Sequence, residues 1–244
     1  MIKYSNLTPR ACEALVGLTE MRGMQLDVLA DFMNIGRTQV YDLANRLLAA
    51  NTVNLLAMVQ RGPKWVVPTR EAAGWVLGWR PGEWQPKLNF ATHCRAVAKT
   101  RVALGACATD QWISDRIMRH EHPGPGRYPY DGLLLRADHR PVAVKVDTSR
   151  HLTGAELARR LNTVVRQAHH DECTEILYVC DGYLTPDDVA TVARHTLPDI
   201  PDLALRVTSL DKLTSIDRLR TRRDAGVPTG TRDKVRRHAT GGAH

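Results

Sequence analysis

The stretch from Gln25 to Asn51 constrains the fold most, because it is typical of two short helices joined by a tight turn. The first helix presents an apolar face made by Leu26, Val28, Leu29 and Phe32. Gly36 then acts as a turn residue or as the N-cap of the next helix. The second helix begins near Arg37, and its apolar residues recur at an amphipathic spacing: Val40, Leu43, Leu47 and Leu48.

The opposite face of this second helix is polar, and its side chains both donate and accept hydrogen bonds. Reading base edges in the major groove of a duplex requires such side chains. We therefore predict that the nucleic-acid-binding residues on this helix are Arg37, Thr38, Gln39, Tyr41, Asn45 and Arg46. The alternative is a plain surface helix, because any two-helix hairpin has a polar outer face.

The segments that flank the two-helix hairpin extend it to a larger motif. Thr8-Pro9 is a strong helix start, with Thr8 as N-cap and Pro9 in the first turn. Residues 53–59 and 64–68 have the pattern of two strands joined by a tight connection. Three helices followed by a β-hairpin with a basic tip predict a winged helix-turn-helix over residues 1–80. In such a domain the third helix enters the major groove, and the tip, here Arg61 and Lys64, contacts phosphates.

Charge and composition limit the partners. The formal net charge is +8, which attracts a polyanion, and nucleic acid is the first candidate. No apolar run approaches the roughly 20 residues that a membrane span needs, and the N-terminus lacks a signal-peptide core. We therefore expect a cytoplasmic protein without a membrane partner. The five cysteines show no paired metal-ligand spacing, so we interpret them as reduced thiols, mostly in the core.

The second half of the chain alternates helices and strands. Residues 78–88 contain two Pro, two Gly and two Trp and mark a boundary, where we expect Trp79 and Trp84 to pack against a domain surface. We place the linker at residues 81–88 and the second domain at residues 89–217. Its expected elements are a helix over 89–107, a hairpin over 130–136 and 141–147, a helix over 153–170, a strand over 175–180, a helix over 185–195 and a strand over 203–207. Residues 112–116 fit either a short strand or a helix start. This order predicts an α/β layer fold with a mixed sheet, and α+β overall.

Three residues on the predicted hairpin form a candidate catalytic group. Lys145 and Asp147 are two residues apart on one strand, so their side chains share a face, and Asp131 lies on the partner strand. Two carboxylates and a lysine on a bent hairpin are the arrangement of metal-dependent PD-(D/E)XK nucleases. There the carboxylates, here Asp131 and Asp147 with help from Asp115, hold Mg²⁺, and the lysine positions the attacking water. A polar cluster that only stabilises the sheet is the alternative.

A family resemblance rests on short motifs along the chain. They are Leu7-Thr8-Pro9-Arg10, Pro68-Thr69-Arg70-Glu71-Ala72-Ala73, Val102-Ala103-Leu104, Trp112-x-Ser114-Asp115-Arg116, Tyr130-Asp131-Gly132 and Val144-Lys145-Val146-Asp147. From Leu7 to Cys180 the layout resembles the replication-relaxation family of plasmids, integrative elements and actinobacterial phages. The resemblance implies a winged helix and a restriction-endonuclease-like domain, and a role in replication or transfer of mobile genetic elements.

Two departures from that family pattern bear on catalysis. Tyr130 stands where the family tends to have Pro, and Lys145 stands where it tends to have Glu. The usual order of the nuclease motif, acid-x-Lys, is also reversed in Lys145-Val146-Asp147. A cation in place of a carboxylate removes a metal ligand and repels the ion. We therefore expect a degenerate second domain, without nuclease activity and without a cofactor; Mg²⁺ is expected only if Asp131, Lys145 and Asp147 are active.

The C-terminal segment, residues 218–244, is strongly basic. It has eight Arg and Lys residues against two Asp residues, and its composition is typical of a disordered tail. Such a tail either contacts phosphates without reading sequence or only keeps the chain soluble. The expected function is binding to double-stranded DNA in replication, transfer or transcriptional control, with a homodimer left open. The alternatives are a Mg²⁺-dependent DNA endonuclease and a winged-helix adaptor for other proteins.

Overall fold

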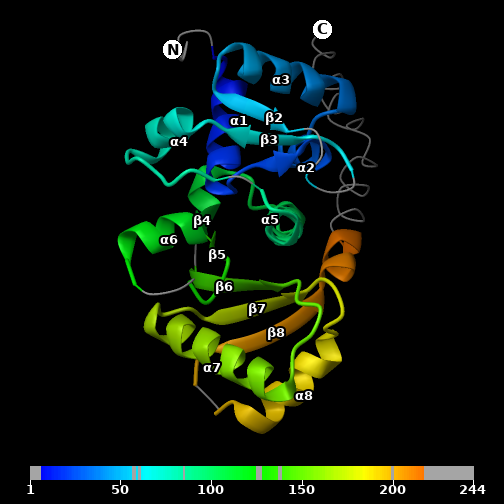
Figure 1. Cartoon of the computed structure of the whole chain (residues 1–244). Helices are drawn as coiled ribbons and strands as arrows, with labels where there is room; N and C mark the ends of the chain where they lie inside the picture. Colours follow the sequence, from blue (N-terminus) through cyan, green and yellow to red (C-terminus); the bar gives the residue numbers. More distant parts are fainter. Residues whose placement is uncertain are drawn as a thin grey trace, which may run out of the picture.

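The computed structural model describes residues 7–56, 59, 62–84, 86–124, 128–136, 139–198 and 201–216. The N-terminal part runs α1 (Pro9–Glu20), β1 (Met24–Gln25), α2 (Leu26–Phe32), α3 (Arg37–Ala49), β2 (Val53–Leu56), β3 (Trp65–Pro68) and α4 (Arg70–Leu77). Its three strands form an antiparallel sheet in the order β1-β3-β2, and Figure 1 labels β2 and β3 of this sheet. The predicted helices and hairpin are confirmed, whereas β1 has only two residues and gave no recognisable pattern in the sequence.

Local capping explains where these helices begin. Thr8 accepts a hydrogen bond from the Ala11 amide at the start of α1, and Pro9 occupies the first turn. Gly36 is the N-cap of α3, as predicted, and its amide donates to Oε1 of Gln39 at 3.1 Å. Gly17 of α1 lets α2 approach closely, because a Cβ there would lie 2.5 Å from the Phe32 ring.

The C-terminal part is the predicted α/β layer fold. It runs α5 (Leu88–Ala103), η2 (Thr109–Gln111), β4 (Trp112–Ser114), α6 (Asp115–Glu121), β5 (Gly132–Arg136), β6 (His139–Asp147), α7 (Gly154–His170), β7 (Glu175–Cys180), α8 (Pro186–Thr196) and β8 (Ala204–Ser209). The five strands lie in the order β4-β5-β6-β7-β8. The first three are antiparallel and the last three parallel, so the mixed sheet is confirmed.

The structure of the C-terminal part differs from the sequence predictions at several element boundaries. Residues 112–116 contain both a strand end and a helix start, β4 and α6, rather than one of them. The helix predicted over 89–107 ends four residues earlier, at Ala103. Residues 210–216 form a helix that the sequence interpretation missed. The helix predicted over 153–170 is confirmed as α7, and Thr153 and Glu156 form a capping box at its start.

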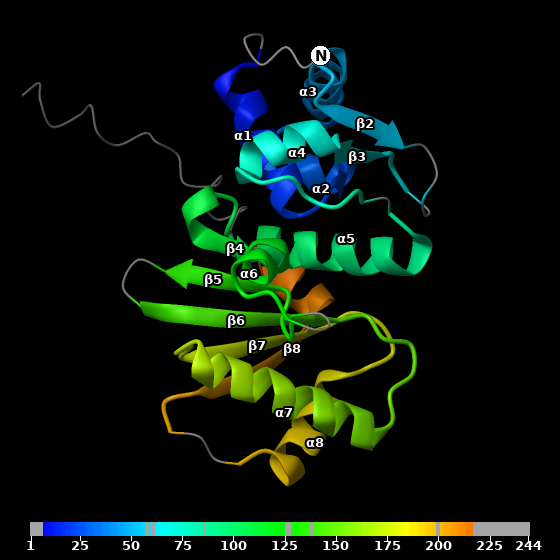
Figure 2. The same ribbon diagram turned by 60° about the vertical axis from the view of Figure 1, so that its left-hand side comes forward.

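The two faces of the five-stranded sheet are covered differently. Helices α7 and α8 lie on one face, and α5 lies between the other face and the N-terminal part (Figures 1 and 2). The alternation along β6 matches these layers. Val142, Val144 and Val146 belong to the core cluster that includes residues of α5, whereas Ala143 packs with residues of α7. The predicted common face of Lys145 and Asp147 does not bring their side chains together: Lys145 contacts Asp131, which is also bound by His93 of α5, whereas Asp147 contacts Arg160 of α7.

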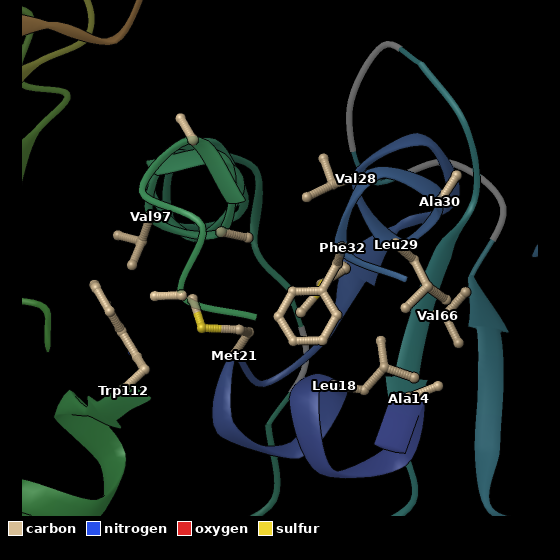
Figure 3. Packing of buried hydrophobic residues seen from close by; sticks show 14 of the residues in the cluster. Ala14, Leu18, Met21, Val28, Leu29, Ala30, Phe32, Val66, Val97 and Trp112 are labelled. Atoms are coloured by element: carbon tan, nitrogen blue, oxygen red, sulfur yellow. The ribbon is translucent and has the colours of Figure 1, made fainter. Parts of the chain in front are cut away.

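The two parts of the molecule share one apolar core. Met21 and Phe32 of the N-terminal part lie beside Val97 of α5 and near Trp112 of β4 (Figure 3). The linker is fixed as predicted from its tryptophans: the Trp79 ring stacks on His120 with centroids 4.0 Å apart, and Trp84 packs on Trp65. Because the apolar core continues from the N-terminal part into α5 and β4, the domain boundary at residues 81–88 stays a prediction.

Two further expectations concern the cysteines and membrane-spanning segments. None of the five cysteines is part of a disulfide, and Cys94, Cys173 and Cys180 are buried, in agreement with their predicted role in the core. Among the described residues, none of the helices has the length and apolar character needed to cross a bilayer. Arg61 and the basic tail, residues 218–244, lie outside the described residues.

Candidate functional site

The polar face of α3 is the first candidate, and the structure exposes all of it. Val40, Leu43, Ala44 and Leu47 are buried against the N-terminal core. The predicted nucleic-acid-binding residues on the other side are all exposed: Arg37, Thr38, Gln39, Tyr41, Asn45 and Arg46. Tyr41 is 50% exposed, which is high for a large aromatic side chain. Helix α3 lies at the end of the molecule opposite α7 and α8 (Figure 1).

Not every residue of this face is equally available to a partner. Oε1 of Gln39 already accepts the Gly36 amide and so helps to begin α3. The Asn45 side chain, in contrast, makes no hydrogen bond within the described part of the chain. Asn45 is therefore better suited than Gln39 for contacts with a base edge, and its replacement leaves the helix start intact.

A groove beside α3 brings in a residue that the sequence interpretation missed. It has a volume of about 170 Å³ and lies between the start of α1 and α3, with Arg10 and Arg46 among its lining residues. Nη2 of Arg10 donates to the carbonyl of Met33 at 3.4 Å, which directs the guanidinium toward the turn before α3. The helix start at Thr8-Pro9 was recognisable in the sequence, but the proximity of Arg10 to α3 depends on the tertiary fold.

The hairpin that follows α3 is anchored at its base. Gln25 donates through Nε2 to the Pro63 carbonyl at 2.9 Å, and the Leu26 amide donates to the Lys64 carbonyl at 3.0 Å. The Lys64 side chain is exposed, as a phosphate contact requires. The predicted contact at Arg61 cannot be compared, since that residue lies outside the described ranges.

Asp131 is the centre of the interior polar group. Its carboxylate contacts Nζ of Lys145 at 3.1 Å, Nε2 of His93 at 2.8 Å and the Val146 amide at 2.8 Å. Burial disfavours the charged form, but the Lys145 ammonium and the His93 hydrogen bond outweigh it and hold the pKa of Asp131 below its usual range. The predicted proximity of Asp131 and Lys145 is thus correct, and His93 from α5 is an additional member.

Asp147 belongs to a different set of contacts. It accepts hydrogen bonds from Arg160 of α7, from the Tyr178 hydroxyl at 2.6 Å and from the Ser149 amide at 2.9 Å. Burial again raises its pKa, and the hydrogen bonds from Tyr178 and Ser149 reverse that effect, so that the pKa lies below the usual value. Sequence spacing gave no indication of Arg160 or Tyr178, because both come from later elements.

The two aspartates therefore do not form one site. Each carboxylate carries its own cation, Lys145 for Asp131 and Arg160 for Asp147. Asp115, the proposed helper, contacts Arg22 at 2.6 Å instead. Among the described residues, no group of three or more His, Cys, Asp or Glu side chains is placed to hold a metal ion. The arrangement can connect elements and keep both carboxylates ionised.

Comparison with models of known protein families, with curated proteins and with solved structures found no match to this chain. The two candidate sites are accordingly interpreted from their own geometry. One is a polar helix face directed to solvent. The other is a set of ion pairs around the five-stranded sheet, here called the buried ion pairs, whose carboxylates Asp131 and Asp147 are 13% and 0% exposed.

Proposed function

We propose that this chain binds double-stranded DNA through α3 of an N-terminal winged helix. The observation that carries the proposal is the exposed polar face of α3, where Arg37, Asn45 and Arg46 are exposed. The order of helices and strands and the sheet order β1-β3-β2 support a winged helix. Such a helix enters the major groove, and Arg10 and Lys64 at its sides are suitably charged for phosphates.

We propose further that the second domain is nuclease-like but does not cleave DNA. A hard cation such as Mg²⁺ needs oxygen ligands, and here the carboxylates of Asp131 and Asp147 are each bound to a basic side chain. An ammonium or guanidinium at that position opposes a second cation electrostatically. This pairing favours the non-catalytic interpretation over the Mg²⁺-dependent endonuclease.

For the biological setting, we propose replication, transfer or transcriptional control of a plasmid, integrative element or phage, in the cytoplasm. The resemblance to the replication-relaxation family is the basis for this setting. The basic tail would add sequence-independent phosphate contacts to those of α3. The adaptor alternative has less support, because the α3 face is rich in side chains that suit base edges.

The proposed function is tested by a binding selection on random duplexes with the full chain, run with and without Mg²⁺. Binding to the selected site is then measured for Asn45→Ala and Arg46→Ala. The matched control is Arg194→Ala, since Arg194 is an exposed arginine on α8, away from α3. We expect Asn45→Ala to cost about 1–3 kcal/mol at the selected site and less on unrelated duplexes. Arg46→Ala should weaken binding on all duplexes, and Arg194→Ala should bind as the parent chain does.

Two outcomes would contradict the proposals separately. An equal loss on every sequence for Asn45→Ala, or no loss, would exclude base recognition by α3. Metal-dependent nicking of plasmid DNA that disappears in both Asp131→Ala and Asp147→Ala would establish the nuclease instead.

A further inference from the structure

A small cavity lies between the N-terminal part and the α/β part, and neither the α3 face nor the sheet explains its chemistry. Its volume is about 80 Å³. Polar lining residues come from the end of α1 and the residues after it, from α5, from α6 and from the sheet and the segment before it: Glu20, Arg22, His93, Ser114, Asp115, Arg119, Tyr128, Asp131 and Lys145. Several waters or one compact ion of a few heavy atoms fit such a space.

Ser114 is the most informative residue of the cavity wall. It is 1% exposed, and within the described part of the chain its hydroxyl has no hydrogen-bond partner. Ser114 is also the N-cap residue of α6, a position where a serine hydroxyl usually accepts an amide hydrogen bond, yet it makes no such bond here. A buried hydroxyl without a partner is costly. Its place in the cavity wall indicates that its partner is a ligand.

The basic side chains around the cavity add further donors. Nε of Arg119 is buried and, among the described residues, also lacks a partner. Lys145 is only 13% exposed and contacts a single carboxylate, so its ammonium retains donors. Arg22 adopts a left-handed backbone conformation with φ of 62°, and this conformation accompanies the contact of its guanidinium with Asp115. The cavity therefore contains more hydrogen-bond donors than its walls use.

The acceptors, in contrast, are already engaged. Asp115 contacts Arg22 at 2.6 Å and Arg119 at 3.9 Å. Asp131 contacts Lys145 and His93, and Glu20 contacts Arg101 at 2.5 Å. Among the lining residues, three cations (Arg22, Arg119 and Lys145) stand beside three carboxylates (Glu20, Asp115 and Asp131), and Arg101 behind the wall adds a further positive charge by contacting Glu20. Because each lining carboxylate is already paired with a cation, the donors without partners are complementary to an anion with several acceptor oxygens.

We propose that this cavity binds a phosphate-sized oxyanion, held by the Ser114 hydroxyl, Nε of Arg119 and the Lys145 ammonium. The ion is either free inorganic phosphate or the terminal phosphate of a small molecule. The site is separate from α3, so it goes beyond the proposed DNA binding and does not depend on it. Because residues of both parts of the chain line the cavity, a bound oxyanion bridges α1, α6 and the five-stranded sheet.

The site is tested by calorimetric titration of the full chain with inorganic phosphate at constant ionic strength and without DNA. Acetate and chloride serve as comparison anions. We expect one saturable phosphate site per chain. Ser114→Ala should weaken phosphate binding about tenfold, since a hydrogen bond to a charged group is lost. The thermal midpoint of this variant without phosphate should not fall, because the hydroxyl has no partner to lose.

A second variant and two controls keep the outcome clear. Arg119→Lys retains the charge but removes the Nε donor, and it should also weaken phosphate binding. Arg46→Ala on α3 and Arg194→Ala on α8 should bind phosphate as the parent chain does. The site is wrong if phosphate binding is not saturable, if both cavity variants bind as the parent chain does, or if only Arg46→Ala loses binding. Adenosine monophosphate in a parallel titration identifies the source: tighter binding than phosphate indicates a terminal phosphate, and equal or weaker binding indicates the free ion.

Discussion

The α3 face and the buried ion pairs around the five-stranded sheet contain the same kinds of residue but use them differently. On α3, Arg37, Asn45 and Arg46 are directed to solvent. Around the sheet, Asp131 and Asp147 have cationic partners inside the molecule. A polar side chain without an internal partner is available to another molecule, whereas one with several internal partners mainly stabilises the fold.

The buried ion pairs also connect elements that are distant in the sequence. His93 of α5 contacts Asp131, and Arg160 of α7 contacts Asp147 on β6. A similar pair joins the two parts of the molecule, Glu20 of α1 with Arg101 of α5. We therefore expect opposite effects in the two regions. Substitutions in the buried ion pairs should lower the stability of the fold, and substitutions on the α3 face should affect DNA binding alone.

The largest effect is expected for Arg101→Met. Arg101 is completely buried, contacts Glu20 and donates to the carbonyls of Ala106 at 2.7 Å and Ala108 at 3.3 Å. Its guanidinium also lies 5.1 Å from the centroid of the Phe32 ring. Removing one partner of a buried ion pair leaves an uncompensated charge, so the free energy of unfolding should fall by about 3–5 kcal/mol. Urea-induced unfolding measures this change.

The control for this variant is the more exposed pair between Arg95 and Asp27. These side chains are 24% and 37% exposed, so Arg95→Met should cost much less, about 1 kcal/mol or below for the lost ion pair. Neutralising the carboxylate as well, in Arg101→Met with Glu20→Gln, should restore part of the lost stability. Equal effects for Arg101→Met and Arg95→Met would show that burial does not determine the strength of these contacts.

A smaller, pH-dependent effect is expected for Asp147→Asn. The pKa of Asp147 is lower in the folded chain than its usual value, so its ionised form stabilises the fold above about pH 4. That contribution is lost as pH falls toward the folded-state pKa. At pH 7 the substitution should therefore cost about 1–3 kcal/mol, and the difference from the parent chain should shrink below pH 4. Unfolding curves between pH 3 and 8 test this, and a constant difference would contradict it.

How much of this was predictable depends on the distance over which the residues interact. The starts of α1 and α7 follow from Thr8-Pro9 and from Thr153 with Glu156, because capping involves neighbours in the sequence. The spacing of Lys145 and Asp147 did not give their contacts, since Lys145 is bound to Asp131 and Asp147 to Arg160. The partners His93 and Arg160 were not predictable, since they come from α5 and α7 and no local pattern encodes that packing.

The distance between interacting residues also decides whether a strand, or a contact between the two parts of the molecule, was predictable. Strand β1 is only two residues long and exists because it pairs with β3: Met24 lies opposite Val66, and Gln25 lies opposite Trp65. The pair of Glu20 and Arg101 spans 81 residues, and in the sequence each looks like an ordinary helix-surface charge. The exposed face of α3 was predictable in full, because it depends only on helical periodicity and on one apolar side being buried.

The smallest effect on stability is expected on α3, for Asn45→Ala. Asn45 is exposed and makes no hydrogen bond within the described residues, so no contact is lost. Alanine has a higher helix propensity than asparagine, by about 0.5 kcal/mol, and the unfolding free energy should stay the same or rise by that amount. The same variant is expected to bind its selected duplex less tightly, which separates a binding role from a stabilising one. Urea-induced unfolding of Asn45→Ala beside the parent chain measures the stability. A loss of more than about 1 kcal/mol exceeds what a surface substitution causes. It would mean that Asn45 contributes to the fold, and the contrast between the α3 face and the buried ion pairs would then be wrong at this residue.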